Sequence, residues 1–302
     1  MTAPTAPVDG MVRAMHAAGI LPTDPSAIAA DGVLRRFHGD GHRPGTRNVA
    51  VALHHDHGFA QDWKTGATCT WSAKSTTKMS RAERDVFYAQ IRAAKAEAQR
   101  QREVEQQHAA ERAAHLWAKT KPARADHPYL VRKRIEPGYA RQMGDMLVLK
   151  IEDIDGAIRS LQYIGPDGIK RMLTGGAKKS HFVIVSGSLP AQRVLICEGW
   201  ATGMSLATQH DDAAVLAAVD CGNLRHVAEA VRRRYPDEQI VVGADDDRLI
   251  NGNPGLTKAR EAAAAVGGRL IRPAWPEGSP QSLTDFNDLA AWLGDYPEAA
   301  HA

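Results

Sequence analysis

The regular alternation of short apolar strands and helices after Pro190 most constrains the fold of this chain. Short apolar strands separated by helices are typical of a parallel sheet that helices cover on both faces. The expected strands span 194–197, 213–219, 239–243 and 269–272, and the expected helices span 201–209, 224–234, 257–266 and 286–293. The sequence therefore predicts an α/β domain over residues 189–296.

Two of these predicted strands end in acidic residues. Glu198 follows the first strand, and Asp245 and Asp247 follow the third. Ligands bind beyond the carboxyl ends of strands in open parallel sheets, so we expect these carboxylates at the functional edge. Asp245 and Asp247 lie two residues apart on an extended segment and can therefore address the same point.

Three converging carboxylates repel one another unless a cation neutralises them. Hard oxygen ligands select Mg²⁺ or Mn²⁺, and such a site suits phosphoryl or nucleotidyl transfer. Each acid alone would be weak evidence, because acids at strand ends often cap the next helix. Their order along the chain, with all of them at one predicted edge, favours the metal site.

This pattern resembles the Toprim family, which bacterial primases share with type IA and type II topoisomerases and some nucleases. The matching segments are Leu195–Gly199, which contains the glutamate, and Asp245–Asp247. The resemblance implies that Glu198 acts as an acid, a base or a metal ligand. It also implies that Asp245 and Asp247 hold the metal.

The later segment Thr284–Leu289 is similar to the Asp-Phe-Asn-Asp-Leu segment of phage and plasmid primases. By that resemblance Asp285 or Asp288 completes the acidic site, although either could instead be the N-cap of the last helix. Replicative primases often carry an aspartate four residues after the glutamate. This chain has Thr202 there, which leaves the number of metals open.

Four basic residues precede the predicted α/β domain: Lys170, Arg171, Lys178 and Lys179. They lie in a β-rich segment, 126–187, that resembles the part preceding Toprim in such primases. Phosphate-binding side chains are expected at this position, and a solvated hairpin is the competing interpretation.

The N-terminal half divides into a β-rich part and a helix. Residues 31–75 are rich in Gly, His and β-forming residues, whereas 78–121 lack Gly and Pro and have the composition of a long helix that Pro122 ends. We predict a small N-terminal β-rich domain at 1–77, a helical linker at 78–122, a basic primase-core segment at 123–188 and the Toprim domain at 189–296. Similarity to the leading domain of plasmid and phage primases extends the resemblance to roughly the whole chain.

Histidines and a cysteine in the N-terminal part could suggest zinc. They are His38, His42, His54, His55, His57 and Cys69. Structural zinc sites usually contain two compact ligand pairs, and neither Cys197 nor Cys221 lies nearby. We therefore expect no zinc, and reduced thiols.

These features together favour a DNA primase, a template-directed nucleotidyltransferase that makes short RNA primers on single-stranded DNA. The resemblance implies Mg²⁺ or Mn²⁺, a single-stranded DNA template and nucleoside triphosphates. No helicase module follows, so we expect a replicative helicase, where one takes part, to be a separate partner.

Two rival functions stay open: a Toprim nuclease, and a non-catalytic DNA-binding replication accessory of a mobile element. A topoisomerase is less favoured, because no large extra domain is present to supply a nucleophilic tyrosine. No signal-peptide pattern or apolar run of membrane-spanning length occurs, so we expect a cytoplasmic protein without a membrane partner.

Overall fold

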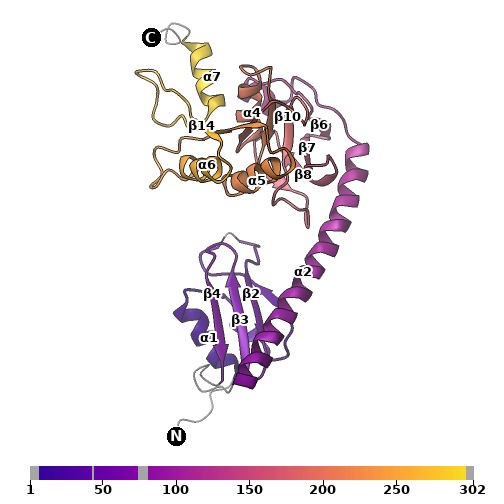
Figure 1. The fold of residues 1–302 in the computed structure, drawn as a ribbon, viewed down its shortest axis with the longest axis vertical. Helices are drawn as coiled ribbons and strands as arrows, with labels where there is room; N and C mark the ends of the chain where they lie inside the picture. The colour runs from indigo at the N-terminus through magenta and orange to yellow at the C-terminus, as the bar shows by residue number, and fades with distance from the viewer. Residues whose placement is uncertain (1–6, 43, 74–80, 297–302) are drawn as a thin grey trace. The chain divides into compact units, whose positions relative to one another are not determined.

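The structure is a computed structural model that describes residues 7–42, 44–73 and 81–296 (Figure 1). The chain forms two compact units, residues 1–97 and 98–302, and the division falls inside the long helix α2, Arg81–Ala118. This helix lies within the range in which a helix was predicted. The expected domain boundary at 77/78 falls outside the described residues. No helix in the described ranges is both long and apolar enough to cross a bilayer.

The N-terminal unit contains a four-stranded antiparallel sheet, as the β-rich composition predicted. Its elements are α1 (Pro7–Ala17), η1 (Pro25–Ala27), β1 (Arg35–Phe37), β2 (Val49–Leu53), β3 (His57–Asp62) and β4 (Thr68–Ser72). Met11 and Met15 of α1 pack on one face, where alternate residues of β2 point. Helix α1 was not predicted from the sequence.

Two of the histidines in this unit have carboxylate partners. The Nε2 atom of His42 lies 3.1 Å from Asp62 Oδ2, and both side chains are buried. The Nδ1 atom of His57 lies 2.6 Å from Asp56 Oδ1, and its ring stacks on His54. Cys69 is partly buried and lies beside the apolar core. The absence of zinc stays a prediction.

The second unit begins with a five-stranded antiparallel sheet. Its elements are β5 (Lys121–Pro122), α3 (Pro128–Lys133), β6 (Arg141–Met143), β7 (Met146–Glu152), β8 (Ile158–Ile164) and β9 (Lys170–Met172). The last turns of α2 cover one face, where Ala113 packs with Val148 and Leu161. The opposite face packs toward the third sheet.

The third sheet has the strand order β10-β12-β11-β13-β14. The elements are β10 (Val183–Ser186), β11 (Arg193–Cys197), α4 (Trp200–Ala207), β12 (Ala214–Ala217), η3 (Cys221–Asn223), α5 (Leu224–Arg234), β13 (Gln239–Gly243), α6 (Pro254–Ala265), β14 (Arg269–Ile271) and α7 (Phe286–Asp295). All neighbouring strands are parallel except β10, which runs antiparallel to β12. The predicted α/β fold with a mainly parallel sheet is confirmed.

Strand β10 pairs within this third sheet, although the sequence analysis had grouped it with the preceding β-rich segment. Val183 pairs with Ala217 of β12. An antiparallel edge strand is common on otherwise parallel sheets. Because β10 precedes the strand-and-helix alternation, its apolar run did not distinguish between the two sheets.

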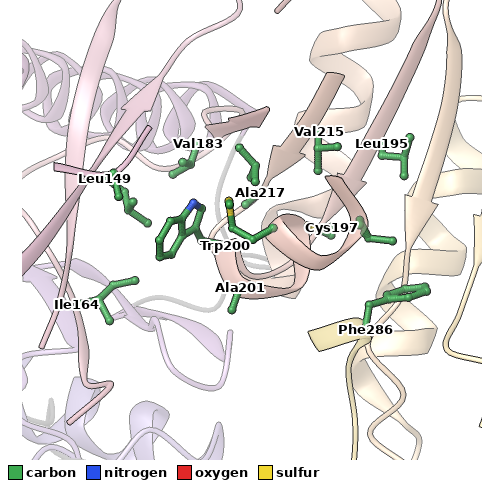
Figure 2. Packing of buried hydrophobic residues seen from close by; sticks show 14 of the residues in the cluster. Leu149, Ile164, Val183, Leu195, Cys197, Trp200, Ala201, Val215, Ala217 and Phe286 are labelled. Carbon is green, nitrogen blue, oxygen red and sulfur yellow. The ribbon is translucent and has the colours of Figure 1, made fainter. Parts of the chain in front are cut away.

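Alternation along the strands gives the third sheet two buried faces. Val194 and Ile196 of β11 face α5 and α6, whereas Leu195 and Cys197 face α4 and the second sheet. Figure 2 shows Trp200 and Ala201 of α4 between Leu149 and Ile164 of the second sheet and the third-sheet residues. This shared core fixes the second sheet against the third.

Candidate functional site

The site lies at the point where the strand order of the third sheet reverses. Successive parallel strands run from β11 to β12 on one side, and the chain then crosses to β13 on the other side of β11. Such a switch point leaves a crevice beyond the carboxyl ends of the two adjacent strands. Glu198 directly follows β11, and Asp245 follows β13 by two residues, so both acids lie at this crevice.

Asp245 is the most perturbed acid of the site. Its pKa is raised from 3.8 to about 8, first by burial and then by the negative charges of Glu198, Asp285 and Asp247, while Lys170 opposes the shift. Its Oδ1 atom is buried and has no hydrogen-bond partner in the described part of the chain. A buried, unpartnered carboxylate oxygen among other carboxylates is a position that a cation would satisfy.

Glu198 faces the same group of acids. Its pKa is raised by burial and by the charges of Asp247 and Asp220, whereas Lys170 and a backbone hydrogen bond from Cys221 act in the opposite direction. Glu198 is therefore held between several negative charges and one nearby cation.

Asp247 lies at the N-terminus of α6. Its Oδ2 atom accepts a hydrogen bond of 2.9 Å from the backbone N–H of Gly255, in the first turn of the helix. A Cβ atom at Gly255 would lie 2.8 Å from the carbonyl oxygen of Asp245, so only glycine permits this close approach. The helix terminus thereby stabilises negative charge on Asp247.

Asp246, between the two aspartates, has a structural role that the sequence analysis did not identify. It is buried, and its oxygens accept hydrogen bonds from Asn253 Nδ2 at 2.7 Å and from Trp275 Nε1 at 2.9 Å. Its backbone N–H donates to Thr284 O at 2.6 Å. Asp246 thus ties the acidic loop to the segment that leads to Asp285.

Asp285 and Asp288 differ in their surroundings. Asp285 Oδ1 accepts the Asp288 N–H as the N-cap of α7, while Oδ2 accepts a 3.2 Å hydrogen bond from Thr202 Oγ1. Asp285 also contributes to the raised pKa of Asp245. Asp288 instead accepts from Thr284 N and forms an ion pair of 3.3 Å with Lys133. Asp285 therefore combines the capping role with a place beside the acids, and Asp288 contacts other groups.

The four basic residues also differ in how near they lie to the acids. Lys170 lies near the acids: a Cβ atom at Gly199, which follows Glu198, would lie 3.9 Å from Lys170 Nζ, and the charge of Lys170 opposes the pKa shifts of both Glu198 and Asp245. Lys178 forms an ion pair with Asp220. Arg171 follows Lys170 on β9, where successive side chains point to opposite faces, and Lys179 is exposed.

Asp220 is an acid of this edge that the sequence analysis missed, although it too follows a strand of the sheet. The preceding residue, Val219, has φ +77°. A β-branched residue in that region is strained, and such strain persists where the surrounding contacts hold it. The loop from 218 to 223 therefore holds Asp220 and the Cys221 N–H at Glu198.

The acids fit a divalent cation in their chemistry, in their common position and in the free oxygen of Asp245. Glu198, Asp245 and Asp247 would hold it, with Asp285 adjacent. Among the described residues no three acidic, histidine or cysteine side chains are already arranged around one point as ligands.

The matching family model covers residues 193–294, which include Glu198, Asp245, Asp247, Asp285 and Asp288, and it describes a Toprim domain. This part of the chain is a Toprim domain. Toprim domains bind divalent metal ions, in agreement with the chemistry of the acidic edge.

Two curated relatives extend the similarity beyond the Toprim domain. The chain is 34% identical over 264 residues to DNA primase TraC of Escherichia coli. The matched region covers 82% of this chain and 24% of that protein. A second Escherichia coli DNA primase TraC is 32% identical over 310 residues, with 96% of this chain and 21% of the relative covered. The chain thus spans less than a quarter of the length of these relatives.

Among solved structures, the primase fragment of the bacteriophage T7 primase-helicase protein matches with a TM-score of 0.42 and 14% sequence identity. The match covers 57% of this chain and 72% of that one.

The raised pKa of Asp245 predicts a pH dependence of stability in metal-free protein. The unfolded carboxyl titrates near 3.8 and the folded one near 8, so its contribution to stability is complete below pH 4 and declines as pH rises through about 8. We therefore compare the free energy of unfolding of Asp245→Asn with that of the unsubstituted chain in EDTA. The difference should shift in favour of Asp245→Asn from pH 5 to pH 9, by on the order of a few kcal/mol. Urea unfolding of both proteins at pH 5 and at pH 9 measures this difference. The same difference at the two pH values would contradict the prediction.

Proposed function

We propose that this chain is the catalytic part of a DNA primase that joins nucleotides on single-stranded DNA with Mg²⁺ or Mn²⁺. The observation that carries the proposal is the position of Glu198, Asp245 and Asp247 beyond the carboxyl ends of β11 and β13 at the switch point of a Toprim sheet, with Asp245 buried and one of its oxygens free. The similarity to DNA primase TraC along nearly the whole chain favours primer synthesis over other Toprim activities.

The residues of the site have separable roles under this proposal. Asp245 and Asp247 hold the metal, Glu198 completes its coordination or moves a proton at the 3′ hydroxyl, and Asp285 supports Asp245. A bound divalent ion supplies neutralising charge for the triphosphate, whose transfer depends largely on positioning and charge. Lys170 is placed to contact a phosphate, because it lies next to the same acids.

The basic residues Lys170, Arg171, Lys178 and Lys179 are proposed to contact phosphates of the template or the nucleotide. Of these four residues, Lys170 acts on Asp245 and Lys178 pairs with Asp220. Arg171 and Lys179 would extend the positive surface to either side. Such contacts position a strand without selecting its sequence.

Primer synthesis tests the proposal with labelled nucleotides, single-stranded DNA and Mg²⁺ or Mn²⁺, scored also for strand cleavage. Asp245→Asn and Asp247→Asn should each lower synthesis at least about a hundredfold, because each removes charge that holds the metal. Glu198→Gln should lose turnover with little loss of DNA binding.

Asp211→Asn, an exposed position before β12 at the opposite edge, is the matched control. Full activity of the Asp245/Asp247 double variant would exclude these acids, and cleavage without synthesis would indicate a Toprim nuclease.

The basic surface makes a second prediction about binding to single-stranded DNA. Each lysine or arginine contact with a phosphate releases counterions and contributes about 0.7 to the slope of affinity against salt. Replacing Lys170, Arg171, Lys178 and Lys179 by Ala should therefore weaken binding to all sequences and flatten the salt dependence, as fluorescence anisotropy can measure.

The control for this experiment removes four positive charges from α5 and α6 instead. It replaces Arg225, Arg233, Lys258 and Arg260, which are exposed, by Ala. An equal salt slope in both fourfold variants would show that the loss reflects net charge alone and would contradict the proposed phosphate contacts of Lys170, Arg171, Lys178 and Lys179.

A further inference from the structure

The side chain of Asn223 connects the basic loop at residues 178–181 to the end of β12. Its Nδ2 atom lies 3.0 Å from Lys178 O, 2.9 Å from His181 O and 2.9 Å from Ala218 O, and its two hydrogens are shared among these three carbonyls. Its Oδ1 atom accepts a 2.9 Å hydrogen bond from Ser180 N. The residue is 1% exposed, so water does not replace these bonds.

The loop that Asn223 holds carries two of the four basic residues. Lys178 pairs with Asp220, and the charge of Asp220 acts in turn on Glu198. Lys179 follows and is exposed. The position of both lysines relative to the acids therefore depends on how the backbone of residues 178–181 is fixed to the third sheet.

The backbone is strained in both segments that the Asn223 side chain connects. Ser180 has φ +65° and Val219 has φ +77°, and neither residue is glycine. Residues in such conformations are retained where surrounding contacts over-determine them, and they are concentrated at functional sites. The hydrogen bonds of Asn223 reach the backbone of Ser180 and the carbonyl that precedes Val219, so they supply such contacts.

The side chain must be an amide of this length. It presents a donor group to carbonyl oxygens and an acceptor to an N–H group from one rigid plane. Aspartate would keep the acceptor and lose the donor, and alanine would lose both.

We propose that Asn223 is a positioning residue that holds Lys178 and Lys179 where they contact phosphate groups bound at the acidic edge. This inference rests on the proposed function and deepens it. Asn223 itself is enclosed, and the hydrogen bonds of its side chain go to the loop and to Ala218, whereas only its backbone N–H donates to an acid, Asp220. It therefore acts through the basic loop and not on the reacting atoms.

Trypsin cleavage after Lys178 and Lys179 reports the state of this loop independently of catalysis. Proteolysis requires local opening, and loss of buried hydrogen bonds favours opening. In the full-length chain without metal, Asn223→Ala should be cut at these two bonds about tenfold faster or more, as measured by mass spectrometry. Asn287→Ala is the matched control, because Asn287 is also buried and donates to Lys133 O and Ser205 Oγ instead.

Kinetics and binding give the functional result. Asn223→Ala should raise KM for nucleotides, or Kd for a labelled single-stranded oligonucleotide, about fivefold while kcat changes less than about twofold. In a chain that already carries Lys178→Ala and Lys179→Ala, the same substitution should add nothing, because its effect passes through the lysines. An additive effect in that background, or cleavage at the rate of the unsubstituted chain, would overturn the proposal.

Two further outcomes keep the inference separate from the primase proposal. If the unsubstituted chain makes no primers while Asn223→Ala is cut faster and binds DNA more weakly, the positioning role stands and primer synthesis fails. If primers form normally and Asn223→Ala behaves as the unsubstituted chain in every measurement, the positioning role fails. Should Asn223→Ala not fold, Asn223→Asp, which keeps the bond from Ser180 N, replaces it and must show the same loss.

Discussion

Repulsion among carboxylates at the switch point of the third sheet is the constraint on which the rest of this structure depends. Burial alone disfavours the charge on Asp245, and the neighbouring acids disfavour it further, which raises its pKa to about 8. A sheet selected only for stability would replace these acids, because an unpaired buried charge is costly. Their presence together supports the proposal that a cation completes the site, because functional sites often conflict with local stability.

The surrounding contacts hold these acids in place without neutralising them. The N-terminus of α6 supports Asp247, and Asp246 secures the acidic loop through Asn253 and Trp275. Lys170 on the second sheet brings one positive charge to the edge. The shared core around Trp200 fixes the two sheets to each other, so the basic strand keeps its place beside the acids.

The sequence allowed the third sheet and its acids to be predicted because both signals are local. Apolar strands alternate with helices, Glu198 directly follows β11, and Asp245 follows β13 by two residues. The roles of Asp246, Asp220 and Asn223 could not be predicted, because each depends on partners distant in the chain, such as Trp275, Lys178 and Ser180. The pairing of β10 with β12 could not be predicted for the same reason, since it is a long-range choice.

The most direct test of the acidic edge as a metal site is the anomalous scattering of Mn²⁺ in crystals of this chain. The predicted result is a manganese peak within coordination distance, about 2.2 Å, of carboxylate oxygens of Asp245 and Asp247, with Glu198 turned toward it. Asp245→Asn crystals soaked in the same way should show a weaker peak or none. Manganese bound elsewhere, with Asp245 still unliganded, would contradict the assignment of these acids.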